Sequence, residues 1–201
     1  AETSMLFEDI VRNDRSVLEL LRTDRTWLDE RLAAHYGIPH IYGSRFREVK
    51  VDPAWQRGGL LRQGSVLTVT SYATRTSPVI RGHWILKNLL GTPPPPPPPD
   101  VPALDGVISE SLPIRERLAK HREMAACASC HNLMDPIGFA LENFDAIGRW
   151  HDVADSRGGF ADGSEFEGVA GLEDVLLKRP ELFVTTLTEK LLLFSGAIQM
   201  A

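Results

Sequence analysis

Residues 127–131 read Cys-Ala-Ser-Cys-His, and this stretch decides how the rest of the chain is interpreted. The chain has only two cysteines, Cys127 and Cys130, and both fall inside it. Two thiols at this spacing, on the last turn of one helix and the start of the next, can reach two neighbouring vinyl groups of one porphyrin. The motif therefore predicts one covalently attached haem c on Cys127 and Cys130, with His131 as an iron ligand.

Two other chemistries use closely spaced cysteines. A structural zinc site normally takes two separate ligand pairs, and the chain has no second cysteine pair. A thioredoxin-like redox pair follows a strand of a βαβ unit, whereas residues 113–124, before the motif, read as a charged helix. Haem attachment explains the motif better than either.

Composition excludes several classes of protein. The chain has 201 residues, of which 43% are hydrophobic and 24% charged, as in ordinary globular domains. Its net charge of −5 argues against a nucleic-acid partner, which needs a basic face. No run of about 18 apolar residues occurs, so we expect no transmembrane segment. The first residues lack the features of a signal peptide, so we expect a leader already removed or a piece of a longer chain.

Hydrophobic periodicity predicts a mainly α fold. Helices are expected over residues 5–11, 15–21, 26–36, 82–90, 113–124, 138–144, 172–177 and 181–194. Residues 46–51 alternate like a strand, residues 65–72 fit a strand or a helix, and residues 156–168 predict a turn or small hairpin. An unbroken proline tract at residues 93–99 must form a polyproline II rod.

These elements predict three parts of the chain. Residues 1–92 form an N-terminal helical region that packs on the haem domain, residues 93–112 a polyproline strap and loop, and residues 113–201 a cytochrome c-like haem domain. The helix before Cys127, residues 138–144 and the terminal helix would form its core. At the end of the chain, core packing is the favoured interpretation of the apolar residues 191–194 and Ile198, and a docking face is the alternative.

The second axial ligand of the iron is open at this point. Met134 lies on the same side of a helix as His131, so it cannot readily reach the opposite face of a haem. We expect His35 first, beside Tyr36 and remote in sequence from the motif. The alternatives are His83, Met124, Met200, another histidine or an open position. Haem propionates usually find arginine or tryptophan donors, for which the candidates are Arg149 and Trp150, then Arg75 or Arg81.

Further blocks carry a wider resemblance. They lie at residues 7–11, 28–38, 70–72, 75–79, 81–84, 89–92 and 135–149, the last reading Asp-Pro-Ile-Gly-Phe-Ala-Leu-Glu-Asn-Phe-Asp-Ala-Ile-Gly-Arg. Together they resemble the C-terminal part of large secreted cytochrome-bearing proteins of planctomycete type. These proteins have several domains of unknown function and end in a Cys-x-x-Cys-His segment. The resemblance implies export to the periplasm or cell surface, and a chain that is the tail of a longer polypeptide or one subunit of an assembly. His35 falls in a matching block, Leu-Ala-x-His-Tyr-Gly.

The expected function is that of an electron-transfer cytochrome module rather than a catalyst, with redox proteins or neighbouring haem subunits as partners. A peroxidase-like or oxidase-like enzyme with an open distal position is the first alternative, because no suitable methionine follows the motif. A structural haem subunit of an assembly is the second.

Overall fold

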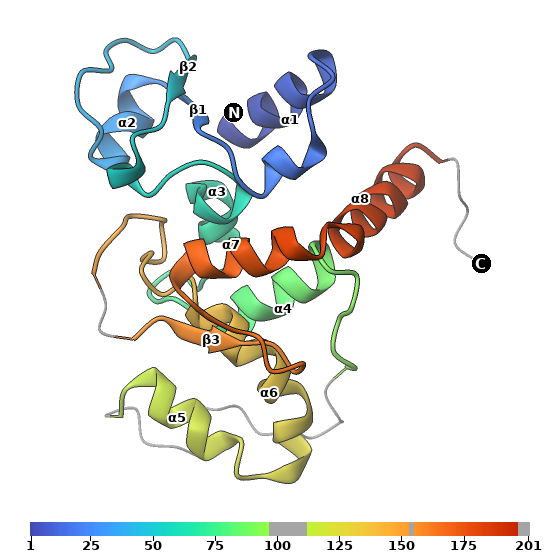
Figure 1. The fold of residues 1–201 in the computed structure, drawn as a ribbon. Coiled ribbons are helices and arrows are strands. Elements are labelled where there is room, and N and C mark those ends of the chain that lie inside the picture. Colours follow the sequence, from blue (N-terminus) through green and yellow to red (C-terminus); the bar gives the residue numbers. More distant parts are fainter. Residues whose placement is uncertain (97–111, 153–154, 197–201) are drawn as a thin grey trace.

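The structure is a computed structural model that describes residues 1–96, 112–152 and 155–196 (Figure 1). Within these ranges the chain is mainly α-helical, as the sequence predicts, and its sheets are small. The α-helices are α1 (Glu2–Arg12), α2 (Glu30–Tyr36), α3 (Gly64–Val69), α4 (Pro78–Asn88), α5 (Ile114–His121), α6 (Ala125–Phe139), α7 (Gly168–Lys178) and α8 (Pro180–Phe194). Short 3-10 helices occupy Val17–Leu20, Pro53–Trp55 and Leu60–Arg62. None of the helices in the described ranges is long and apolar enough to cross a membrane.

Each sheet is one antiparallel pair of short strands. β1 (Arg25–Leu28) pairs with β2 (Arg47–Lys50), and β3 (Arg157–Gly159) pairs with β4 (Glu165–Glu167). The strand expected over residues 46–51 and the hairpin expected over residues 156–168 are therefore confirmed. The ambiguous residues 65–72 contain most of helix α3.

The helix expected over residues 26–36 is wrong in its first part, where β1 lies. The boundary is set by Asp29, whose side chain accepts a hydrogen bond from the backbone N–H of Leu32 at 2.8 Å and caps α2. The helix ends at Gly37, as expected, with this residue in the left-handed conformation at φ 72°. A short strand and a short helix thus share a stretch whose apolar spacing fits one longer helix.

Helix α6 lies between α4 and β3, and glycines permit the close approach. A Cβ added to Gly82 of α4 would lie 1.9 Å from the carbonyl oxygen of Met134. One added to Gly138 of α6 would lie 1.8 Å from the carbonyl oxygen of Pro78, and one on Gly158 of β3 would lie 1.9 Å from the α6 backbone. Backbones this close leave α6 little freedom to shift.

The separate helix expected over residues 138–144 is wrong. Helix α6 continues through Gly138 to Phe139, and turns follow. Gly138 is therefore a packing residue of α6 that faces α4, rather than the first residue of a separate helix.

The main packing partner of α6 is α4, not the terminal helix that we expected in the core. Helix α8 contacts α7 and extends away from the body of the molecule (Figure 1). Phe183 and Thr186 of α8 are buried, whereas residues 191–194 are exposed. The interpretation of residues 191–194 as core is therefore wrong, and Ile198 lies outside the described residues.

One hydrophobic cluster contains residues from Leu6 in α1 to Phe183 in α8. It draws on both the 1–92 and the 113–201 regions, and the three-part division stays a prediction. Of the proline tract, only residues 93–96 are described, and they form neither helix nor strand. The rest of the expected strap lies outside the described residues.

Candidate functional site

The Cys-x-x-Cys-His motif lies on a single helix. Cys127 is in the first turn of α6, and Cys130 and His131 are in the second, after a chain that leaves α5 at His121. The expectation that the thiols fall on two successive helices is thus wrong. Because residues three and four apart on a helix share a side, the two thiols and the imidazole lie on one side of α6.

Both cysteines are free thiols. Cys127 is buried, and Cys130 is half-buried against the hydrophobic cluster. The Cys130 Sγ lies 3.9 Å from the carbonyl oxygen of Pro95, so the start of the proline tract passes the second thiol.

Asp135 holds the imidazole of His131. The carboxylate is fully buried, and its Oδ1 lies 2.9 Å from Nδ1 of His131, one helical turn earlier. Its Oδ2 accepts a hydrogen bond from Nη1 of Arg122 at 2.7 Å. An ionised carboxylate only accepts, so Nδ1 carries the proton. In the neutral ring Nε2 then has the free lone pair, and no side chain or backbone donor in the described ranges is bonded to it.

A second histidine lies against the first. The ring of His121, at the end of α5, contacts the ring of His131 edge-on at 4.6 Å between centroids. His121 is buried, and its Nδ1 has no hydrogen-bond partner among the described residues. Burial, and then the proximity of His131, lower the pKa of His121, so a neutral imidazole is favoured here.

Asp135, Arg122 and His121 are not singled out by the Cys-x-x-Cys-His motif alone. The spacing of His131 and Asp135, four residues apart, could have indicated the first of them, since such pairs meet on a helix. The other two come from α5 and the turn after it, and only the packing of α5 on α6 brings them to the motif.

The structure does not bring His35 to His131. His35 lies on α2, at the opposite end of the molecule from α5 (Figure 1). Its Nε2 donates to the carbonyl oxygen of Ile147 at 2.8 Å, and its ring lies 5.5 Å from that of Tyr36. The arrangement gives no support to His35 as the second iron ligand.

The other named candidates for the second iron ligand are His83, Met124 and Met200. His83 is half-buried on α4, next to the glycine that contacts α6. Met124 directly precedes α6 and is 37% exposed. Met200 lies outside the described residues. The identity of the second ligand therefore stays open.

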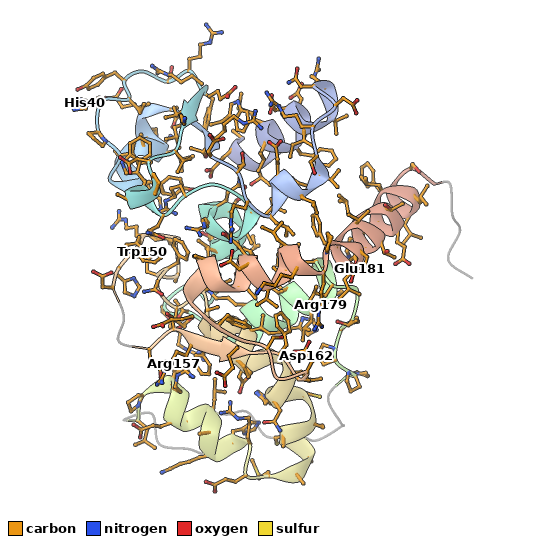
Figure 2. All side chains as sticks on the ribbon, viewed as in Figure 1. His40, Trp150, Arg157, Asp162, Arg179 and Glu181 are labelled. Atoms are coloured by element: carbon orange, nitrogen blue, oxygen red, sulfur yellow. The ribbon has the colours of Figure 1, made fainter. Side chains whose placement is uncertain are left out.

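The predicted propionate partners are not beside the motif. Arg149 is exposed in the turn beyond α6, where its backbone N–H donates to Asp145 at 2.8 Å. The half-buried Trp150 packs edge-on against Phe144 at 5.1 Å, and Figure 2 shows it on the side of the molecule below α2, above Arg157.

The two alternative arginines also have other contacts. Arg81 is fully buried and donates to the carbonyl oxygens of Leu141 and Phe144 at 2.7 and 2.9 Å, which anchors the turn after α6. The guanidinium of Arg75 lies 4.4 Å from the ring of Tyr72.

The donor set of the motif fits a haem c. Attachment needs two free thiols with the correct spacing and one ring nitrogen with a free lone pair, and α6 offers these on one side. In the parts of the chain that the structure describes, no three His, Cys, Asp or Glu side chains are grouped to hold a bare metal ion.

Comparison with protein families finds two matches. Residues 57–154 match PSCyt3, a protein of unknown function (DUF1588), and residues 1–38 match PSD4, a protein of unknown function (DUF1592). The motif at residues 127–131 lies within the first match. No curated protein and no solved structure matches the chain. The two matched segments correspond to domains of the planctomycete-type cytochrome family.

Proposed function

We propose that this chain is a c-type cytochrome module that carries one covalent haem and passes electrons within a larger, exported protein or complex. The observation that carries the proposal is the side of α6 on which Cys127, Cys130 and His131 lie together, with both thiols free. The match of residues 57–154 to a domain of cytochrome-type proteins supports the same assignment.

Each residue of the motif has a distinct part. The thiols of Cys127 and Cys130 would form the thioether bonds, and Nε2 of His131 would bind the iron. A bound haem supplies reversible one-electron chemistry at its iron. The protein orients the imidazole through Asp135, at 2.9 Å from Nδ1. It also holds α6 in place through the glycine contacts with α4.

The exposed end of α8 supports the proposal of a larger assembly. Leu191, Leu192 and Leu193 are between 38% and 43% exposed, and Phe194 is 93% exposed. Contiguous apolar side chains on a surface are typical of contacts with another protein. Redox proteins or neighbouring haem subunits are the partners that this function requires.

Haem attachment is tested by producing the chain in a bacterium that has a c-type cytochrome maturation system. We expect an intact mass that exceeds the polypeptide by one haem, and a haem spectrum that survives denaturation and extraction into acidified organic solvent. Colourless protein with the bare polypeptide mass and two titratable thiols would overturn the proposal.

Ligand binding then separates electron transfer from catalysis. A reduced protein with a sharp low-spin α band, unchanged by carbon monoxide or cyanide, supports electron transfer with both axial positions filled. Rapid binding of these ligands, together with peroxide turnover above that of free haem, would instead show an enzyme with an open distal position.

A further inference from the structure

We propose that Asp135 and Arg122 are positioning residues that set the reduction potential of the iron bound by His131, in opposite directions. The inference rests on the proposed haem attachment and deepens it. The juxtaposition that carries it is a fully buried carboxylate whose two oxygens are divided between an imidazole and a guanidinium.

Each carboxylate oxygen of Asp135 faces a different partner. Oδ1 faces Nδ1 of His131 at 2.9 Å, and Oδ2 faces Nη1 of Arg122 at 2.7 Å. A carboxylate without exposure to water stays charged only with such partners. Arg122 is 23% exposed on its side chain, so it supplies the countercharge from the edge of the site.

A carboxylate that accepts a hydrogen bond from Nδ1–H makes Nε2 a stronger electron-pair donor to the iron. A stronger, more negative donor set favours ferric over ferrous iron, and so lowers the potential. Arg122 draws negative charge away from the same carboxylate, and so moderates this effect. Removal of the carboxylate charge should raise the potential, and removal of the arginine charge should lower it.

Nearby groups do not supply a substitute for this pair. His121 contacts the ring of His131 from α5, but among the described residues the two oxygens of Asp135 face only His131 and Arg122. The backbone at position 135 does not depend on the carboxylate for its placement. The α6 backbone on either side of it, at residues 134 and 136, packs against Gly82 and Gly158. Asp135→Asn is nearly isosteric, and we expect it to fold.

The test is a redox titration of the haem-loaded chain and its variants, in which mediators carry one electron per haem from an added reductant (dithionite) to ferric iron, or from ferrous iron to an added oxidant (ferricyanide). We expect Asp135→Asn to shift the equilibrium about tenfold towards ferrous iron, which corresponds to about 59 mV for one electron. Arg122→Gln should shift it at least threefold towards ferric iron. Arg122→Lys keeps the charge and should stay within about twofold of the unmodified chain.

Glu142→Gln is the matched control. Glu142 is also mostly buried and paired with an arginine, Arg81 at 2.8 Å, but it lies beyond the end of α6. This variant removes the same charge and should leave the potential within about twofold. A purely structural role for Asp135 predicts no shift, or shifts of one sign in Asp135→Asn and Arg122→Gln, and either result would overturn the inference.

The two proposals fail in different ways. If the unmodified chain carries no covalent haem, the proposed function is overturned. If haem attaches and the potentials do not move in opposite directions, the proposed function stands and only the role of Asp135 and Arg122 is lost. If Asp135→Asn does not fold, the Arg122 pair of variants decides the question alone.

Discussion

Asp135 in α6 and Glu173 in α7 are both fully buried carboxylates held by arginine, yet their surroundings differ. Glu173 accepts from Nε and Nη2 of Arg62 at 2.7 and 2.8 Å, and from Arg22 at 3.1 Å. Arginines thus occupy both of its oxygens, and they tie α7 to the N-terminal half of the chain. Asp135 gives one oxygen to arginine and the other to the imidazole of His131.

The difference separates a cluster that stabilises the fold, around Glu173, from one that positions the imidazole of His131, around Asp135. Around Glu173 both carboxylate oxygens are paired with arginines, and these arginines bond further to Gln56, Asp174 and a backbone carbonyl. Around Asp135 the pairing ends at a histidine whose second nitrogen is free, beside two free thiols. We therefore expect changes at Glu173 to alter stability and changes near Asp135 to alter haem chemistry.

The largest expected effect is all-or-none. Replacement of both cysteines, Cys127→Ser with Cys130→Ser, should abolish covalent haem, because no thioether bond can form. Intact mass spectrometry after denaturation measures this. Ser129 lies between them, and its hydroxyl donates to the backbone of Ala126 at 3.2 Å and lies 3.8 Å from the Sγ of Cys130. Ser129→Ala removes this hydroxyl but keeps both thiols, and should retain full loading. Covalent haem in the double variant would show that attachment occurs elsewhere.

The second-largest expected effect tests the cluster of Glu173 and its arginines. Glu173→Gln should lower the free energy of unfolding by about 3–5 kcal/mol, since it leaves arginines next to a neutral amide in a buried site. Urea titration followed by circular dichroism measures it. The exposed pair of Glu8 and Arg12 provides the control, and Glu8→Gln should cost less than about 0.5 kcal/mol. A loss of similar size in both would mean that burial does not distinguish the two pairs.

Packing of α6 supplies a smaller effect. Gly82→Ala should destabilise the fold by about 1–3 kcal/mol, because its Cβ would lie 1.9 Å from a backbone carbonyl of α6. Gly171→Ala in α7 is the matched helical control, with its nearest contact at 3.2 Å and with better helix propensity. Thermal unfolding of the two variants compares them directly. Equal melting temperatures would argue against the close contact between α4 and α6.

Glu2 is a third buried carboxylate, and its effect on the pH dependence of stability is the smallest that we expect. Glu2 accepts from the hydroxyls of Thr26 and Tyr36 rather than from arginine, at 2.5 and 2.7 Å. Burial raises its pKa above the ordinary 4.5, against the lowering effect of these hydrogen bonds. The folded state then binds more protons than the unfolded state just above pH 4.5, so stability falls as pH rises from 4.5 to the folded pKa.

Glu2→Gln should remove this component of the pH dependence. The difference in unfolding free energy between the variant and the unmodified chain should therefore change with pH above 4.5 and then level off. Urea titrations at a series of pH values measure it. A difference that is flat across this range would mean that Glu2 ionises normally in the folded state.

Local sequence signals predicted much of the secondary structure. The presence and type of α1, β2 and α5, and the end of α2 at Gly37, follow from apolar spacing, alternation and a glycine stop, whereas the start of α1 and the end of α5 each differ by three residues from the prediction. The secondary-structure predictions are wrong where a residue contacts a part of the chain that is distant in sequence. Gly138 was expected to begin a separate helix but lies inside α6, where it allows α4 to approach, and residues 26–28 fit a helix but pair with a strand some 20 residues later.

The amino-acid sequence by itself determined the thiol spacing of the motif, its adjacent histidine and the mainly helical character of the chain, because these depend on contacts within a few residues. Only the tertiary structure decided that His35 lies apart from His131, that His121 contacts its ring and that Arg122 pairs with Asp135. It also decided that α4 rather than α8 packs on α6. The physical reason is that side-chain neighbours from different elements are set by how whole faces pack, and a single sequence does not state which faces meet.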